Sequence, residues 1–229
     1  KEISIGTAKP TSEEMQGITH YLVDCVELSQ PFSVADYVKL AKKFIQKIEQ
    51  SGKLPIIAGG TGLYIRSLLQ NVKFTQEKHD PNLREVLKLR AETEGPQVLL
   101  EELRAFDPES AQRFHPNNLT RIIRAIEIYR TTGITMTEQI KQSKQEPSPY
   151  RVCMLGLNFR DRQKLYERID RRVDTMIENG LLQEAEQVLK NEGARTAMQA
   201  IGYKELAPYF CGKTSLAEAV ENLKRETRH

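Results

Sequence analysis

Near the start of the chain, apolar residues form two short runs with a helical stripe between them. The runs at 20–24 and 54–58 have strand length, and the second is rich in β-branched side chains, which favours a buried parallel strand. Between them, Ser33 and Asp36 have the spacing of a helix capping box, and Gly52 can end that helix. Apolar side chains recur there at every third or fourth position: Val34, Tyr37, Val38, Ala41, Phe44, Ile45 and Ile48. The pattern predicts a strand–helix–strand unit.

The pattern changes between residues 75 and 149. No run of strand type occurs there, and the segment 121–130 gives one of the clearest of several short helical signals. A strand signal returns at 152–157 and is followed by amphipathic helical segments, the last of which begins near Ser215. We therefore predict an α/β fold with a parallel sheet. Residues 1–75 and 148–229 form its core domain, and residues 76–147 form a helical insertion domain.

Composition and charge are those of a soluble globular protein. Of the 229 residues, 39% are hydrophobic and 28% are charged, and 34 basic against 31 acidic side chains give a net charge of +3. No apolar run approaches the roughly eighteen residues of a membrane span, so a membrane protein is excluded and a cytoplasmic location is expected. The apolar stripes are all explained by core packing, so we expect a monomer. The cysteines are too far apart to indicate a disulfide or a zinc site: Cys25, Cys153 and Cys211.

A glycine-rich turn follows the second predicted strand. Gly59, Gly60 and Gly62 surround Thr61, directly before another apolar-periodic segment. Glycines let the backbone approach a ligand, and peptide N–H groups at a helix start attract phosphate. Thr61 would add a hydroxyl at the carboxyl end of a strand, where open α/β sheets bind ligands. A tight turn without a ligand explains the same spacing.

Two arginine clusters are candidate phosphate-binding sites. Arg121 and Arg124 are three residues apart in a predicted helix and are therefore neighbours on one face. The second cluster consists of Arg168, Arg171 and Arg172, with Asp170 and Asp174 interleaved. A solvated face with surface ion pairs explains this second cluster almost as well, and the same alternative applies to the first cluster taken alone. Together with the glycine turn, the clusters favour a phosphate-rich substrate.

Several strings, in order along the whole chain, resemble the tRNA dimethylallyltransferase (tRNA isopentenyltransferase) family. They are Ile5-Gly-Thr-Ala-Lys-Pro10, Phe32-Ser-Val-Ala-Asp36, Gly59-Gly-Thr-Gly-Leu-Tyr64, His115-Pro-Asn-Asn118 with Arg121-Ile-Ile-Arg-Ala-Ile-Glu127, Arg168-Ile-Asp-Arg-Arg-Val-Asp174 and Gln199-Ala-Ile-Gly-Tyr-Lys204. The resemblance implies a core like that of P-loop nucleotide-binding proteins with a helical insertion domain. It also implies transfer of a dimethylallyl group from dimethylallyl diphosphate, assisted by Mg²⁺, to the exocyclic amine of the adenine beside the tRNA anticodon. Because that amine is a weak nucleophile, the diphosphate leaving group has to be stabilised and the base has to be unstacked into a pocket.

The resemblance assigns roles to individual residues. Thr61 corresponds to an active-site threonine that contacts the reacting adenine and the diphosphate oxygen. Arg168 and Arg172 are candidates for binding the diphosphate, and Lys9 is a further one; no protein ligands to a metal are expected. The tRNA-contacting positions implied, besides Thr61, are Arg84, Thr120, Arg121, Ile122, Ile123, Arg124, Gln199, Ala200, Ile201, Gly202, Tyr203 and Lys204. Thr120 stands where the family often has glutamine. This difference affects only the tRNA contact expected of that one side chain.

The sequence also departs from the family pattern at its two ends. A phosphate-binding glycine loop and an aspartate general base are expected upstream of Ile5, and a basic segment is expected beyond His229. We expect both to belong to a longer polypeptide and the chain as given to be inactive without them. Two alternatives stay open: a non-catalytic tRNA-binding fragment that binds the anticodon stem-loop, and a P-loop small-molecule phosphotransferase that turns over ATP. Neither a complete P-loop motif nor a nucleophile elbow occurs in the sequence.

Overall fold

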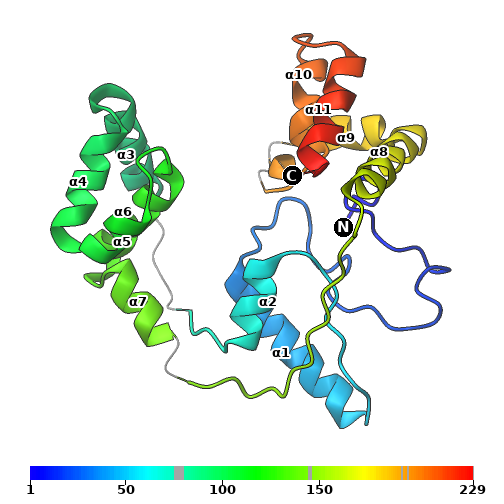
Figure 1. Ribbon diagram of the computed structural model, residues 1–229, viewed down its shortest axis with the longest axis horizontal. Helices are drawn as coiled ribbons and strands as arrows, with labels where there is room; N and C mark the ends of the chain where they lie inside the picture. The colour runs from blue at the N-terminus through cyan, green and yellow to red at the C-terminus, as the bar shows by residue number, and fades with distance from the viewer. Residues whose placement is uncertain (75–79, 144–145, 192, 195, 229) are drawn as a thin grey trace. The chain divides into compact units, whose positions relative to one another are not determined.

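The computed structural model describes residues 1–74, 80–143, 146–191, 193–194 and 196–228. Within these ranges every regular element is helical (Figure 1). The α-helices are α1 (Val34–Gln50), α2 (Gly62–Leu69), α3 (Pro81–Glu94), α4 (Pro96–Phe106), α5 (Pro108–Arg113), α6 (Leu119–Thr132), α7 (Met136–Ser143), α8 (Arg162–Glu178), α9 (Leu181–Lys190), α10 (Tyr203–Phe210) and α11 (Leu216–Arg228), and a 3₁₀ turn, η1, covers Ala197–Gln199.

The chain divides into two compact units, one formed by 1–56 with 153–229 and the other by 57–152. The boundary expected between residues 75 and 76 lies outside the described residues, and the structure instead divides the chain after Ile56. The second boundary falls between Val152 and Cys153, a few residues beyond the expected position at 147.

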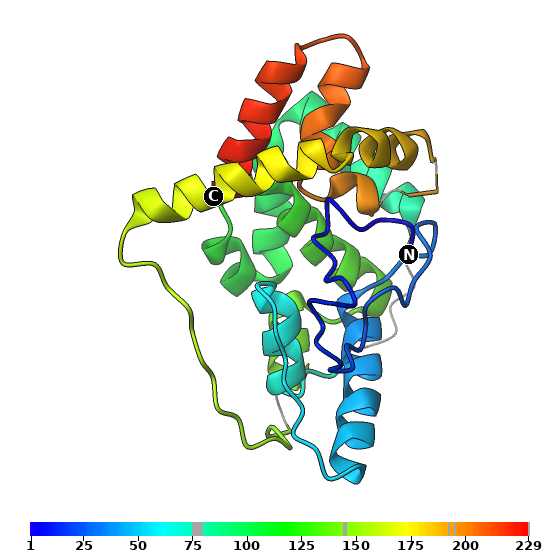
Figure 2. The same ribbon diagram turned by 90° about the vertical axis from the view of Figure 1, so that its right-hand side faces the viewer.

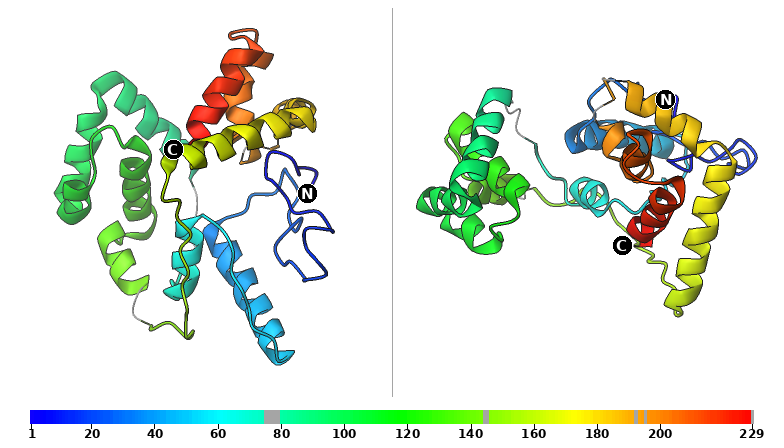
Figure 3. Two further views of the ribbon diagram at one scale, coloured as in Figure 1. Left: turned by 45° about the vertical axis from the view of Figure 1, so that its right-hand side comes forward. Right: turned by 90° about the horizontal axis from the view of Figure 1, so that it is seen from above.

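A helical bundle forms most of the unit 57–152 (Figure 3). Several of its helices start or stop at a residue with a local reason. Asp80 accepts hydrogen bonds from the backbone N–H groups at the start of α3, and Gly95, at φ 90°, separates α3 from α4. Gly133 ends α6 in the left-handed conformation. The apolar faces of α3 to α6 bury one core: Leu87, Ala91, Leu99, Leu100, Leu103, Ala111, Ile122, Ile123, Ala125 and Ile126.

A second core lies between α8, α9, α10 and α11 (Figure 2). Asp161 caps α8, and the left-handed Gly180 lets the chain turn directly into α9. The buried residues are Val173, Leu181, Ala185, Val188, Ala194, Tyr203, Leu206, Ala219 and Leu223, and Ile3 and Ile5 from the start of the chain pack against them. The N-terminal segment is therefore held by residues near the other end of the sequence, from Val173 to Leu223.

The amphipathic segment predicted between the two strand signals is α1. Ser33 and Asp36 form the expected capping box, with both reciprocal hydrogen bonds present. The ring of Phe44 contacts that of Tyr21 at a centroid distance of 4.6 Å. Tyr21 belongs to the run 20–24, which was expected to be a strand and has no strand structure.

The predicted α/β fold with a parallel-sheet core is wrong for the described residues, because none of them is in a β-strand. Segments 54–58 and 152–157 run without regular structure, and their apolar side chains face solvent. Leu54 and Ile56 are 82% and 83% exposed, and Leu155 is 85% exposed. A strand needs a partner backbone for its hydrogen bonds, and within the described residues neither segment makes a backbone hydrogen bond to another. Apolar, β-branched composition alone therefore did not produce a sheet.

Candidate functional site

The glycine turn leads into α2, as the sequence predicts. Thr61 occupies the N-cap position, and its backbone carbonyl accepts hydrogen bonds from the N–H groups of Tyr64 and Ile65. Its side chain makes no capping hydrogen bond and is exposed. The Thr61 hydroxyl is therefore available to a ligand beside the peptide N–H groups that a helix start leaves without intrahelical partners.

Arg84 and Arg124 come together around one carboxylate. The Nε and Nη2 groups of Arg84 on α3 donate to the two oxygens of Glu127 on α6, at 2.8 and 2.6 Å. The Nη1 atom of Arg124 lies 3.7 Å from Glu127 Oε2. The Glu127 side chain is 4% exposed, whereas those of Arg84 and Arg124 are 36% and 41% exposed. A buried anion thus holds Arg84 by two hydrogen bonds and has Arg124 within ion-pair distance.

The other residues of this α6 string divide between surface and core. Thr120 and Arg121 are exposed, and Arg121 forms no ion pair with any residue that the structure describes. Ile122 and Ile123 are buried in the bundle core. A side-chain contact with RNA at this string is therefore open to Thr120, Arg121 and Arg124, whereas the two isoleucines orient the helix that carries them.

The aspartates interleaved with the arginine cluster on α8 form ion pairs with another helix, α11. Asp170 accepts from Arg228 of α11, with Nε at 2.9 Å, and Asp174 pairs with Lys224 at 2.7 Å. Arg168 and Arg172 are exposed and form no ion pair within the described residues. The two aspartates pair with α11 and not with these arginines, and a solvated face with surface ion pairs still explains the cluster. Lys9 is also occupied, since its Nζ lies 2.6 Å from Asp24.

The segment 199–204 presents some residues and buries others. Gln199, Ile201 and Lys204 are exposed, Ala200 is half-buried, and Gly202 is buried at φ 110°, a conformation that favours glycine. Tyr203 is fully buried, and its hydroxyl donates to Glu184 at 2.9 Å. In this structure the Tyr203 side chain fixes the segment from within and offers no surface to RNA.

Glu184 on α9 joins that segment to the N-terminal string. Its carboxylate accepts from the backbone N–H groups of Ser4, Ile5 and Gly6, at 2.6, 3.0 and 2.7 Å. Burial opposes ionisation, but the hydrogen bonds from these groups and from Tyr203 outweigh it and hold the pKa of Glu184 below its usual value. Burial and the neighbouring carboxylate raise the pKa of Tyr203. Glu184 is therefore an ionised anchor between strings at opposite ends of the chain.

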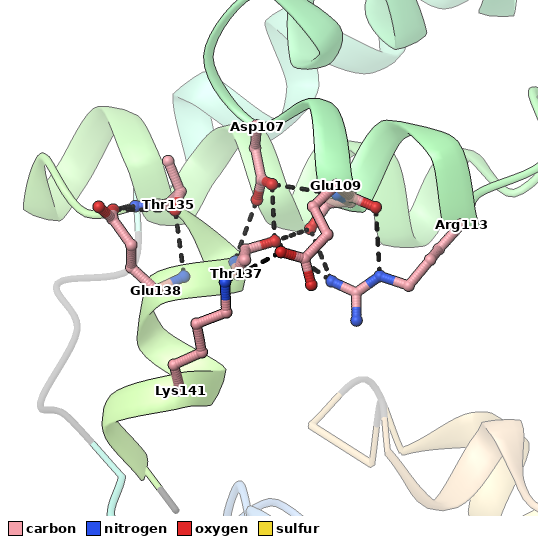
Figure 4. A network of polar contacts seen from close by, with 8 residues as sticks. Asp107, Glu109, Arg113, Thr135, Thr137, Glu138 and Lys141 are labelled. Carbon is pink, nitrogen blue, oxygen red and sulfur yellow. Dashed lines mark hydrogen bonds and ion pairs between the residues drawn. The ribbon is translucent and has the colours of Figure 1, made fainter.

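A further polar network lies where α5 meets α7 (Figure 4). Asp107, 2% exposed, accepts from the backbone N–H of Ser110, and from the backbone N–H and hydroxyl of Thr137 at 3.1 and 2.7 Å. Burial raises the pKa of Asp107, but these donors outweigh it and the net shift is downward. Arg113 lies beside the network and donates to Thr137 at 3.2 Å. The network attaches α7 to the bundle.

Sequence reasoning missed the three carboxylates that organise these sites. Glu127 follows Arg124 by three positions, and helix periodicity could have paired those two side chains. Its stronger partner, Arg84, precedes it by 43 positions, and no local pattern reveals that contact. Glu184 and Asp107 are held by contacts of the same long-range kind.

The described residues contain no group of three or more His, Cys, Asp or Glu side chains placed to hold a metal ion. The described cysteines Cys25, Cys153 and Cys211 are free thiols. None of the described helices is long and apolar enough to cross a membrane.

Known proteins match this chain along its whole length. The family model described as IPP transferase matches residues 1–229. A tRNA dimethylallyltransferase of Thermoanaerobacter sp. (strain X514) is 50% identical, covering 100% of this chain and 73% of the relative. The tRNA dimethylallyltransferase of Bacillus subtilis (strain 168) is 47% identical, covering 100% of this chain and 72% of that relative.

Solved structures give the same result. The crystal structure of the full-length tRNA isopentenylpyrophosphate transferase from Bacillus halodurans matches with a TM-score of 0.67 and 40% identity, covering 100% of this chain and 71% of that one. A eukaryotic dimethylallyltransferase acting on tRNA matches with a TM-score of 0.77 and 29% identity, covering 98% of this chain and 57% of that one. With the family model matched from residue 1 to residue 229, the chain belongs to the IPP transferase family.

Proposed function

We propose that the protein is a tRNA dimethylallyltransferase. It transfers a dimethylallyl group from dimethylallyl diphosphate to the exocyclic amine of the adenine adjacent to the tRNA anticodon. The observation that carries this proposal is the match to relatives of that name over the entire chain, at 50% identity for the Thermoanaerobacter protein. The exposed Thr61 at the start of α2 and the arginines of α3 and α6 supply groups of the kind that the reaction needs.

Thr61 is the proposed catalytic residue. Its hydroxyl is not used for capping, so it can hydrogen-bond to the adenine amine or to an oxygen of the departing diphosphate. The carbon–oxygen bond to the diphosphate breaks as the new carbon–nitrogen bond forms, and the amine nitrogen gives up a proton to the general base that the family resemblance implies. Negative charge meanwhile grows on the diphosphate. A hydroxyl and peptide N–H groups placed there stabilise that charge most in the transition state.

Two cationic surfaces have separate proposed tasks. Arg168 and Arg172, which have no acidic partner within the described residues, neutralise the diphosphate. Arg84, Arg121 and Arg124 bind the phosphate backbone of the anticodon stem-loop, and the exposed Gln199, Ile201 and Lys204 provide further contacts. Arg168, Arg172 and residues 199–204 belong to one compact unit, and Arg84, Arg121 and Arg124 belong to the other.

Mg²⁺ is proposed to enter with the donor. The described residues hold no carboxylate cluster that would bind the ion by protein groups alone. Mg²⁺ usually keeps several waters and binds through substrate phosphates, so the diphosphate itself would provide ligands. Bound there, the ion would lower the charge of the leaving group.

The test is a transfer assay with the polypeptide as its gene encodes it. Radiolabelled dimethylallyl diphosphate and unmodified tRNA are incubated with the wild type, with Thr61→Ala and with Thr93→Ala. Thr93 is a control in the same unit, because its hydroxyl bonds only within its own helix. We expect Thr61→Ala to retain tRNA binding and to lose about 10²-fold in kcat, with Thr93→Ala unchanged. Binding of tRNA by the wild type without any labelled product would instead favour a non-catalytic binding protein, and ATP turnover without tRNA would favour a phosphotransferase.

A further inference from the structure

Glu127 is an unexpected residue at a surface meant for a polyanion. Its carboxylate lies between Arg84 and Arg124, two of the three arginines proposed to bind RNA phosphates. A carboxylate repels phosphate, and its presence reduces the formal charge of the Arg84, Arg121, Arg124 and Glu127 group from +3 to +2. If attraction were the only requirement, this position would be better filled by a neutral side chain.

The geometry indicates what the carboxylate does. Arg84 uses Nε and Nη2 on Glu127, at 2.8 and 2.6 Å, which is the bidentate arrangement that fixes the guanidinium plane. A guanidinium has five N–H donors, so the edge that includes Nη1 remains for another acceptor. Because Glu127 is 4% exposed and Arg84 is 36% exposed, the bound edge faces the bundle and the remaining edge has access to solvent.

Arg124 approaches the same carboxylate from one turn back along α6, with Nη1 at 3.7 Å from Oε2. Arg84 and Arg124 therefore converge on one point although 40 positions separate them in the sequence. The helices beneath them are fixed by core residues, among them Leu87 of α3 and Ile122 and Ile126 of α6. The bidentate pair therefore leaves the Arg84 side chain little freedom for an incoming phosphate to remove.

We propose that Glu127 is a positioning residue that preorganises Arg84 and Arg124 as a clamp for a backbone phosphate of RNA. This inference rests on the proposed function, and it adds that the arrangement of the cations contributes more to affinity than the charge lost to the carboxylate. Positioning and simple electrostatics predict opposite signs when Glu127 is neutralised. With Glu127→Gln, attraction alone predicts binding that is tighter by up to about fivefold, because one negative charge is removed near the phosphates. Positioning predicts binding that is weaker by about tenfold, because Arg84 loses its bidentate partner.

The bundle contains a matched control. Glu102 of α4 is 22% exposed and pairs with both Arg90, at 2.7 Å, and Arg130. Glu102→Gln makes the same charge change in the same kind of arginine pair, and its partners, Arg90 and Arg130, are not among the arginines proposed to bind RNA. The dissociation constant of a fluorescently labelled anticodon stem-loop RNA is measured by anisotropy for both variants and the wild type, over a series of salt concentrations. Circular dichroism at the assay temperature establishes that each variant is folded.

A double-mutant cycle separates positioning from a general structural effect. We expect Glu127→Gln to weaken binding about tenfold in the wild type and much less in an Arg84→Ala background, with Glu102→Gln unchanged or slightly tighter. In the transfer assay Glu127→Gln should raise KM for tRNA and leave kcat nearly unchanged. If Glu127→Gln does not fold, Arg84→Lys tests the positioning role in its place, because lysine keeps the charge and loses the bidentate geometry. Binding of the stem-loop that is about tenfold weaker supports the proposal. Unchanged binding overturns it.

Tighter binding by Glu127→Gln, or an equal loss in the Arg84→Ala background, would overturn the positioning role and leave the proposed function intact. Wild-type protein that binds no stem-loop RNA would overturn both.

Discussion

Replacing Glu184 by glutamine should show how much the junction between the two ends of the chain contributes to stability. Glu184 Oε2 accepts from Ser4 and Ile5, and Oε1 accepts from Gly6 and the Tyr203 hydroxyl. Glutamine keeps one oxygen and turns an NH₂ group toward the other pair of donors. Whichever way the amide is oriented, two hydrogen bonds to a charged acceptor are lost.

Each such hydrogen bond contributes about 1.5–3 kcal/mol, and water can replace part of this because the site is half-buried. We therefore expect Glu184→Gln to lower the free energy of unfolding by about 2–4 kcal/mol. At roughly 2–4 °C per kcal/mol for a protein of this size, the melting temperature should fall by about 4–16 °C. The assay is urea unfolding followed by circular dichroism. Glu186→Gln is the control on the same helix, because Glu186 makes an exposed pair with Lys190 that contributes about 0.5 kcal/mol or less.

The pH dependence has a defined sign. Because the folded protein lowers the pKa of Glu184, its stabilisation is fully present above the ordinary carboxyl pKa. It is lost as the pH falls through the lowered value. The difference in unfolding free energy between wild type and Glu184→Gln should therefore be constant near neutral pH and shrink in acid. A difference below about 1 kcal/mol at pH 7, or one that grows on acidification, would refute the reasoning.

Two further substitutions test other contacts. Gly6→Ala places a Cβ 2.7 Å from the buried Tyr203 hydroxyl and should lower the free energy of unfolding, measured in urea, by about 1–3 kcal/mol. In the control Gly156→Ala the new Cβ meets no atom within 4 Å, so the free energy of unfolding should hardly change. Equal effects of the two substitutions would contradict the predicted overpacking. Asp107→Asn leaves the backbone N–H of Thr137 facing an amide NH₂ and should cost about 1.5–3 kcal/mol, with faster proteolysis within α7 as a second measure. Unchanged stability and proteolysis would show that this network does not attach α7.

Local signals in the sequence predicted helix ends well and the sheet poorly. The capping box of Ser33 and Asp36 is present, and the last helix begins after Ser215, which exchanges hydrogen bonds with Glu218. These features depend on residues three positions apart, which a sequence displays directly. A strand depends on a partner that can lie anywhere along the chain, and the apolar runs 54–58 and 152–157 have no such partner within the described residues.

The same distinction applies to the candidate site. The arginines and the aspartates of α8 lie on opposite faces because of helix geometry. Residues two positions apart in a helix point in directions about 200° apart. Arg168 and Arg172 therefore share one face, and Asp170 and Asp174 share the opposite one. The pairing of Arg84 with Glu127 could not be predicted in this way, since it depends on how α3 packs against α6. The roles of Thr61 and the arginines stay predictions until the assays are done.

The attachment of the N-terminal segment to Glu184 has a consequence for synthesis on the ribosome. Ser4, Ile5 and Gly6 bind a carboxylate that follows them by 180, 179 and 178 positions. At about 5–20 residues per second, the segment waits roughly 10–40 s after it is made before its acceptor exists. The bundle of α3 to α6 has its own core and is translated within that interval. Nascent chains should therefore contain a folded bundle while Ser4, Ile5 and Gly6 still lack their acceptor and stay accessible to chaperones and proteases.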